Sequence, residues 1–387
     1  MRTISPRWIG LPRHALAFLA WHLCLLAPAH AASAYAASAY AASPQPSRLE
    51  QAGQALFDAV GATGVLLVVV TPQQVAIHGY GETQPGNGQK PGAHALLRVN
   101  STSKLLAADV ALTLQAQGVL KLEHPLQRYL PKDVLAPRFG NARLMTLQDL
   151  ALHISSLPRN ISSAELARMK PASGSAARMR WLPGHTLAAA PGTQALYSNL
   201  GYDLLADALA FAAGTPYPAL LQEKLTKPLG MSDTTATPSA EQCARLIQGE
   251  PGSGPCKDTS ASAGSGGLYS SPADMATWLR YMLGLHPARQ PDPRALELIV
   301  KRSALGAFDG LDKGGEASGL GLGWVHLAAT PDRPAILQRT GGGPGFSSFI
   351  AIAPARQTGV FAIMSRSDQA ASAEMVRQVN VLIASAP

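Results

Sequence analysis

A serine lies three residues before a lysine at the start of a long apolar, helical pattern, in the segment 100-NSTSKLL-106. Residues i and i+3 share one face of a helix, so Ser101 and Lys104 can touch. The positive end of the helix and partial burial both lower the pKa of a lysine. A neutral lysine can take the proton of a serine, which then becomes a nucleophile. A backbone N–H at the helix start can stabilise an oxyanion.

The alternative for this segment is a helix cap, since Asn and Ser are favoured N-cap residues. A cap accounts for Asn100 and Ser101 but not for Lys104, because a cation in the first turn opposes the helix dipole. By composition a chain of this length should contain about one Ser-x-x-Lys by chance. The motif therefore needs partners elsewhere in the chain before it predicts a site.

A second set of polar residues comes directly before another helical pattern, in 191-PGTQALYSNLGYDLL-205. The phenol of Tyr197 could relay a proton to a leaving group, and the amide of Asn199 could hold a peptide group of a substrate. The alternative is ordinary, with Ser198 or Asn199 capping the helix and Tyr197 packing against it.

A third set opens an apolar strand pattern, in 337-LQRTGGGPGFSSFIAIAP-354. The glycines would let a ligand lie against the backbone. Arg339 could bind a carboxylate with two parallel hydrogen bonds, and the N–H of Gly342 could be a second oxyanion donor. The alternative is a glycine-rich turn beside a solvent-facing arginine.

The elements that must position these residues follow from the hydrophobic pattern. β-Branched and apolar runs predict strands at 63–70, 75–81, 320–328, 346–353 and 359–365. Helices are predicted from about 101 to 118, at 146–153, 199–214 and 372–385. Strands thus flank a helical insertion, which indicates an α/β arrangement whose sheet is built from both ends of the chain.

The N-terminus predicts export. Three arginines precede an apolar run of about two-thirds the length that a membrane-spanning helix needs, and Ala29-His30-Ala31 offers a cleavage site. We expect a signal peptide at 1–31 and a low-complexity leader at 32–47, with no membrane span in the mature chain. Removing 1–31 lowers the formal net charge from +8 to +5, and no basic run suggests nucleic-acid binding.

Two cysteines remain in the mature chain, Cys243 and Cys256. In an exported protein they can pair across a Gly/Pro-rich loop, and we expect a structural disulfide rather than two free thiols. No Gly-x-Ser-x-Gly elbow, dinucleotide motif or paired histidine spacing is found, so we expect no cofactor and no metal. His153 is expected to pack or cap rather than to act in catalysis.

The order Ser-x-x-Lys, Tyr-x-Asn, basic-Thr-Gly resembles the serine β-lactamase and penicillin-binding protein superfamily. The Tyr-x-Asn form is similar to the class C β-lactamase and DD-peptidase branch. Other segments extend the resemblance over nearly the whole mature chain: 61-GATGVLLVVV-70, 79-GYGETQPGN-87, 152-LHISSLPR-159, 226-TKPLGMSDTT-235, 266-GGLYSSPADM-275 and 321-GLGW-324. The sequence departs from the family at Arg339, where lysine is usual; arginine keeps the charge but does not easily lose a proton.

The resemblance implies an α+β, β-lactamase/transpeptidase-like fold over 48–387. An antiparallel sheet from about 48–100 and 258–387 would be flanked by helices, with a mostly helical part at about 101–257. It implies a periplasmic D-Ala-D-Ala carboxypeptidase that acts on peptidoglycan muropeptides, and some members of the family are also endopeptidases. Ser101, Lys104 and Tyr197 would be catalytic, while Asn199, Arg339, Thr340 and Gly342 would bind substrate.

The same resemblance implies that β-lactams acylate Ser101 and are hydrolysed slowly. Alternatives on the same scaffold are a class C-like β-lactamase, an esterase or D-amino-acid amidase, and a muropeptide or penicillin sensor without turnover. Oligomeric state and loose membrane association are left open by the sequence.

Overall fold

The β-branched run after residue 63 forms a strand that is buried on both faces. The computed structural model describes residues 47–312 and 316–385, and in it Gly64–Val70 is strand β1, with all residues buried. Leu66 and Val68 lie in the larger of two hydrophobic cores, whereas Val65 and Leu67 lie in the smaller one. Burial on both faces explains why this run is continuously apolar instead of alternating.

The sheet has eight strands in the order β2-β1-β12-β11-β10-β9-β8-β6. Every neighbouring pair is antiparallel. Residues from the two ends of the chain meet where β1 pairs with β12, for example at Val65 and Met364. The other strands are β2 (Val75–Gly81), β6 (Val300–Lys301), β8 (Ala317–Leu320), β9 (Val325–Leu327), β10 (Ile336–Gly343), β11 (Phe346–Ala353) and β12 (Thr358–Met364).

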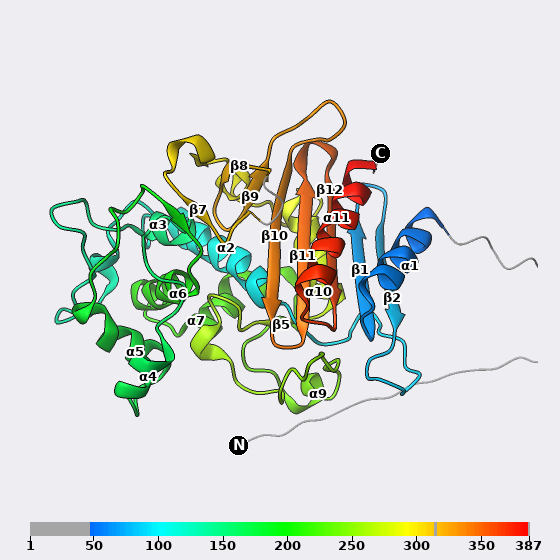
Figure 1. Ribbon diagram of the computed structural model, residues 1–387, viewed down its shortest axis with the longest axis horizontal. Helices are drawn as coiled ribbons and strands as arrows, with labels where there is room; N and C mark the ends of the chain where they lie inside the picture. The colour runs from blue at the N-terminus through cyan, green and yellow to red at the C-terminus, as the bar shows by residue number, and fades with distance from the viewer. Residues whose placement is uncertain (1–46, 313–315, 386–387) are drawn as a thin grey trace, which may run out of the picture. The chain divides into compact units, whose positions relative to one another are not determined.

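Helices cover both faces of this sheet (Figure 1). The first helix, α1 (Arg48–Val60), and the last, α11 (Gln369–Ser385), pack together on one face, with α11 against β11. Helix α10 (Pro272–Met282) packs against β1 and β12. The larger core lies between the sheet and the helical part of the chain. This mixed architecture confirms the α+β fold with a sheet from both chain ends.

Between the two groups of strands the chain is mostly helical. Its helices are α2 (Ser103–Ala116), α3 (Leu147–Ala151), α4 (Ser163–Arg168), α5 (Gly174–Trp181), α6 (Asn199–Ala213), α7 (Tyr217–Leu221), α8 (Lys227–Leu229) and α9 (Ala240–Cys243). Two short pairings lie beside them: β3 (Leu97–Arg98) with β5 (Tyr269–Ser270), and β4 (Ala195–Leu196) with β7 (Phe308–Asp309).

One prediction of secondary structure needs correction, one is refined, and one helix was missed. The single strand expected at 320–328 is two antiparallel strands, β8 and β9, because the chain turns at Gly323, whose φ is +80°. The helix expected from residue 101 begins as a 3-10 turn at Asn100–Thr102 and becomes α-helical at Ser103. Helix α1 was not predicted, although its capping box, Ser47 with Glu50, stands in the sequence.

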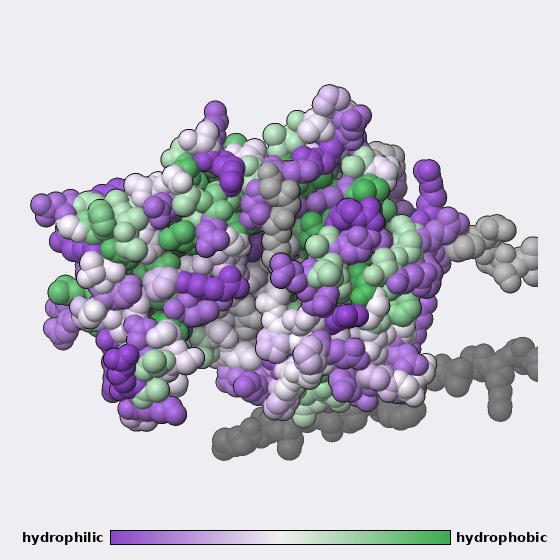
Figure 2. Space-filling model, in the orientation of Figure 1, coloured by the Kyte–Doolittle hydropathy of each residue, from purple (hydrophilic) through white to green (hydrophobic). Residues whose placement is uncertain are grey.

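The signal peptide expected at 1–31 lies outside the described residues, as does the leader expected at 32–47 except for Ser47. On the face drawn in Figure 2, hydrophobic side chains lie in small patches between hydrophilic ones. Within the described part of the chain, no single helix is long and apolar enough to cross a membrane. The bent pair Asn199–Ala213 and Tyr217–Leu229 passes that test only when its two helices are taken together.

Candidate active site

Ser101 lies in a sharp turn that is held by its neighbours. Asn100 adopts a left-handed conformation with φ +49°, its side-chain amide donates to the Phe346 carbonyl at 3.1 Å, and the Ser103 hydroxyl donates to its carbonyl at 2.6 Å. The N-cap of α2 is Thr102, which makes no side-chain capping bond. Asn100 and Ser101 are therefore not helix caps, and the turn presents the Ser101 hydroxyl to Lys104.

Lys104 points its amine at Ser101 from the first turn of α2. Its Nζ lies 3.1 Å from Ser101 Oγ and 2.8 Å from Asn199 Oδ1, and it also donates to the Ser265 carbonyl. The side chain is completely buried, not partly buried as expected. A neutral amine keeps two donors for Asn199 and Ser265 and has one lone pair left for the Ser101 hydroxyl.

Burial is the main cause of the lowered pKa of Lys104, which is about 8; Tyr197 and Asp203 oppose this shift and Arg339 adds to it. The expectation of a lowered pKa is thus met. Its main cause is the removal of the ammonium from water.

Tyr197 lies between β4 and α6, and its hydroxyl forms a hydrogen bond with Ser101 Oγ. Burial raises the pKa of the phenol, but the charges of Lys104 and Arg339 and the hydrogen bonds from Lys104 and Ser101 outweigh it and bring the pKa to about 7. The Ser101 hydroxyl therefore contacts two groups, an amine and a phenol, that can exchange protons near neutral pH.

Asn199 is the first residue of α6, and its amide bridges two parts of the site. Its Oδ1 accepts from Lys104, while its Nδ2 donates to Asn160 Oδ1 at 3.1 Å. Ser198 is the N-cap of this helix and accepts from the Gly201 N–H at 2.9 Å. The capping alternative thus applies to Ser198 and leaves the Asn199 side chain at the site.

Strand β10 runs beside the turn that carries Ser101. A Cβ on Gly341 would lie 2.2 Å from Ser348 Oγ and 3.3 Å from the Ser101 nitrogen, so only glycine fits at this approach. Gly342 is exposed, with open space around it. Thr340 is half-buried and, together with Tyr197, lines a small cleft. The glycine run therefore brings the strand backbone next to Ser101.

Arg339 does not face solvent as a carboxylate-binding arginine would. Its side chain is buried, with Nη1 donating to the Gly323 carbonyl at 2.9 Å and Nη2 lying 3.1 Å from His153 Nε2. The guanidinium carbon lies 5.2 Å from the centre of the Tyr197 ring. Arg339 therefore places a positive charge beside the phenol, and it lines the same small cleft as Tyr197 and Thr340.

His153 fills the space between Tyr197 and Arg339. Its ring stacks on Tyr197 with 4.8 Å between the centroids, and its Nδ1 accepts from the Ser198 N–H at 3.0 Å. Burial, Arg339 and Lys104 hold its pKa well below the usual value, so the imidazole is neutral. The prediction that His153 packs is confirmed, and its φ of +59° shows that the backbone is turned to place it there.

Sequence reasoning missed the turn that receives Lys104. The Ser265 carbonyl accepts from Lys104, and the Ser265 N–H donates to Asp203 Oδ1 at 3.1 Å. A Cβ on Gly264 would lie 2.5 Å from the Tyr202 carbonyl, so this turn is held tightly against α6. The glycine-rich run 264-GSGG-267 was the available indication of this close approach.

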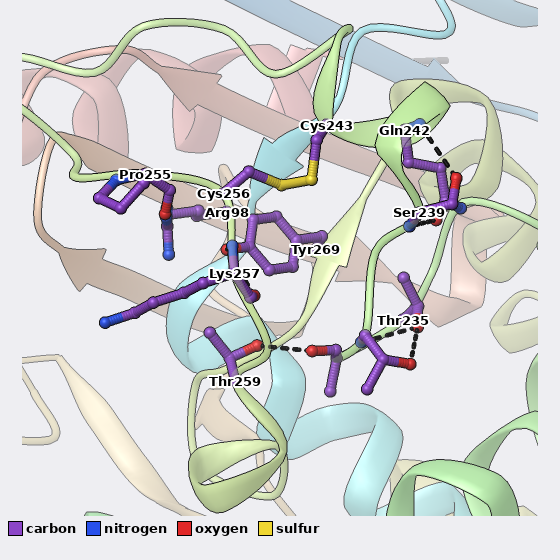
Figure 3. The surroundings of a disulfide bond; sticks show 12 residues. Arg98, Thr235, Ser239, Gln242, Cys243, Pro255, Cys256, Lys257, Thr259 and Tyr269 are labelled. Atoms are coloured by element: carbon purple, nitrogen blue, oxygen red, sulfur yellow. Dashed lines mark hydrogen bonds between the residues drawn. A yellow bond between two sulfur atoms is a disulfide. The ribbon is translucent and has the colours of Figure 1, made fainter.

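Cys243 and Cys256 form the expected disulfide (Figure 3). The loop that it closes leads to β5, where the guanidinium carbon of Arg98 lies 4.9 Å from the centre of the Tyr269 ring and Arg98 Nη2 donates to the Pro255 carbonyl at 2.7 Å. Arg98 comes three residues before Ser101. The disulfide therefore fixes a loop that packs against the strand leading into the site.

Comparisons with known proteins agree with this geometry. The family model described as "Beta-lactamase" matches residues 48–385. The D-alanyl-D-alanine-carboxypeptidase/endopeptidase AmpH of Escherichia coli (strain K12) is 41% identical over 334 residues, which cover 85% of this chain and 86% of that protein.

Two solved structures extend the comparison. A beta-lactamase/D-alanine carboxypeptidase from Yersinia pestis complexed with citrate has a TM-score of 0.79 and 39% identity, covering 87% of this chain and 99% of that one. A class C beta lactamase from Rhodobacter sphaeroides has a TM-score of 0.67 at 20% identity, with 85% and 99% covered. The second likeness is one of fold alone.

Proposed function

The chain belongs to the beta-lactamase family, and from this premise we propose that it is a serine D-alanyl-D-alanine carboxypeptidase, and an endopeptidase, of peptidoglycan stem peptides. The similarity to AmpH supports this activity over a β-lactamase, an esterase or a sensor. The expected export signal supports action in the periplasm.

The observation that carries the proposal is the position of one hydroxyl between two proton-transfer groups. Ser101 Oγ lies 3.1 Å from the buried Lys104 amine and within hydrogen-bond distance of the Tyr197 phenol. We assign Ser101 as the nucleophile that attacks the carbonyl between two D-alanines, and Lys104 as the base that accepts its proton.

The leaving group and the oxyanion need further groups. Tyr197 passes a proton to the nitrogen of the leaving D-alanine, so the amide bond breaks as a neutral amine forms. The N–H groups of Ser101 and Gly342 stabilise the oxyanion. Asn199 orients the peptide and Thr340 lies beside the leaving residue. Water then attacks the acyl-enzyme and releases the shortened peptide.

The test is mass spectrometry of the purified mature protein with a disaccharide pentapeptide and, separately, with a penicillin. We expect loss of one alanine from the muropeptide and a penicilloyl adduct on the peptide that contains Ser101. In S101A both should disappear. Undiminished labelling of S101A by the penicillin would rule out this serine as the nucleophile, and an adduct without alanine release would argue for a sensor or a β-lactamase.

A further inference from the structure

Three cations surround the ring of Tyr197, and they differ in their access to solvent. Lys104 Nζ lies 4.9 Å from the ring centroid, the guanidinium carbon of Arg159 lies 4.7 Å away, and that of Arg339 lies 5.2 Å away. Lys104 and Arg339 are buried, whereas Arg159 is exposed. Of these three cations, only Arg159 is exposed, so only it can bind an anion from solution without moving out of a buried position.

The backbone of Arg159 is fixed to the helix that carries Asn199. The Arg159 carbonyl accepts from the N–H groups of Asn199 at 2.9 Å and Leu200 at 3.1 Å. The carbonyl of Pro158 accepts from the Ser198 hydroxyl at 2.7 Å. These hydrogen bonds fix the backbone of Arg159 relative to the Tyr-x-Asn segment.

The guanidinium of Arg159 keeps its hydrogen-bonding capacity. Across the described ranges, no carboxylate oxygen lies within 4.0 Å of it, and its guanidinium lies over the ring of Tyr197. A Cβ on the neighbouring Gly310 would lie 3.0 Å from the Cβ of Tyr197 and in ordinary contact, at 3.8 Å, with Arg159 Nη1, so this glycine lies beside both residues. Stacking on an aromatic ring orients a guanidinium while leaving its donor edge free.

We propose that Arg159 binds a carboxylate of the peptide substrate and makes the enzyme selective for anionic stem peptides. This inference rests on the proposed function and replaces Arg339 as the carboxylate-binding residue. A planar guanidinium offers two parallel N–H donors that match a carboxylate. Two carboxylates could supply this contact: the C-terminal one of the leaving D-alanine, and one on the side chain of the residue before the D-alanines.

Three N-acylated tripeptides separate these sources. The first is diaminopimelyl-D-Ala-D-Ala, the second has lysine in place of the diaminopimelate and so lacks the side-chain carboxylate, and the third is the lysine peptide with a C-terminal amide, which has neither. The kcat/KM for release of the last residue is compared among the unsubstituted chain, R159Q and a matched control, R128Q, at an exposed arginine elsewhere on the helical part.

We expect R159Q to lower kcat/KM about tenfold or more on peptides that carry the recognised carboxylate, and to leave the amidated lysine peptide unchanged. A loss on both free-acid peptides identifies the terminal carboxylate, and a loss on the diaminopimelate peptide alone identifies the side-chain carboxylate. R128Q should match the unsubstituted chain throughout. An equal loss on all three peptides, or no loss on any, would overturn the inference.

Failure of the proposed function would look different, because the unsubstituted chain would then release no D-alanine from any peptide. The inference would in that case depend on acylation of Ser101 by a penicillin and by its methyl ester. A slower reaction of R159Q with the acid but not with the ester would support it, and equal rates with the unsubstituted chain would overturn it.

Discussion

At the scale of single residues, the site depends on a buried lysine, whose protonated form is disfavoured because it is removed from water. Lys104 is fully buried, with a pKa of about 8. At neutral pH a larger share of this amine is neutral than for a lysine in water. The rate of Ser101 acylation should rise with pH as Lys104 loses its proton, with a midpoint near pH 8, and should fall as the Tyr197 phenol, with a pKa of about 7, loses the proton that it donates. We therefore expect a bell-shaped pH profile with its maximum between about pH 7 and 8.

Replacing Lys104 by arginine should remove this base while keeping a positive charge. A guanidinium cannot lose its proton in this pH range, so we expect K104R to slow acylation by a penicillin roughly 1,000-fold and to remove the rise with pH. The measurement is the acylation rate followed by mass spectrometry between pH 5 and 9. The control is K121R, at an exposed lysine; a K104R enzyme with the unsubstituted pH profile would contradict the assignment.

The sequence predicted the types and the grouping of the site residues but not all of their orientations. Ser101, Lys104, Tyr197 and Asn199 meet because the two motifs begin two helices that pack together. Arg339 was predicted to bind a carboxylate, and its side chain is buried with the guanidinium beside the Tyr197 ring. A residue type and a strand position do not determine which way a long side chain bends, since that depends on neighbours such as Gly323 and His153.

At the scale of elements, helix α6 connects the site to a second layer of charge. Asn199 accepts a hydrogen bond from Lys104 directly. One turn later in the helix, Asp203 accepts from the N–H of Ser265, and the carbonyl of Ser265 accepts from Lys104. Burial raises the pKa of Asp203 to about 6, although Arg178 and the Ser265 contact lower it. Asp203 is therefore ionised at neutral pH, and its charge raises the pKa of Lys104.

We expect D203N to move the acid limb of the pH profile to lower pH. Removing the carboxylate takes away a charge that favours the protonated amine, so Lys104 loses its proton at lower pH; Tyr197, Arg339 and His153 still face it. The matched control is D207N, because Asp207 shares the ion-pair partner Arg178, whereas it is Asp203 that accepts from the Ser265 N–H. A shift to higher pH, or equal shifts in both variants, would refute this positioning role.

The elements themselves were predictable to different degrees. Long runs with a clear period, such as β1, β11 and α6, were predicted within a residue or two of their observed bounds. The pair β8 and β9 was read as one strand because 320-LGLGWVHLA-328 is apolar apart from His326. Glycine is the only sequence indication of a turn inside a buried apolar segment, and glycine also occurs within strands.

At the scale of the whole molecule, the sheet joins segments far apart in the chain, and the disulfide cross-links the segment between its two halves. Cys243 ends α9 in the helical part, and Cys256 precedes the chain that returns to the sheet through β5 (Figure 3). Neither cysteine is one of the proposed catalytic residues. Lys257, the residue after Cys256, is hydrogen-bonded through its backbone to the Tyr269 hydroxyl. Its effect should therefore fall on stability rather than on the chemistry.

We expect the double variant C243S/C256S to lose about 3 kcal/mol of unfolding free energy, because a cross-link across 13 residues restricts the unfolded chain by about that amount. Denaturant unfolding of both proteins, with and without a reductant, measures it. The reductant should destabilise the unsubstituted protein by a similar amount and leave the double variant unchanged. The folded double variant should still be acylated at Ser101. A large loss of acylation without a loss of stability would show that the loop positions the site instead of stabilising the fold.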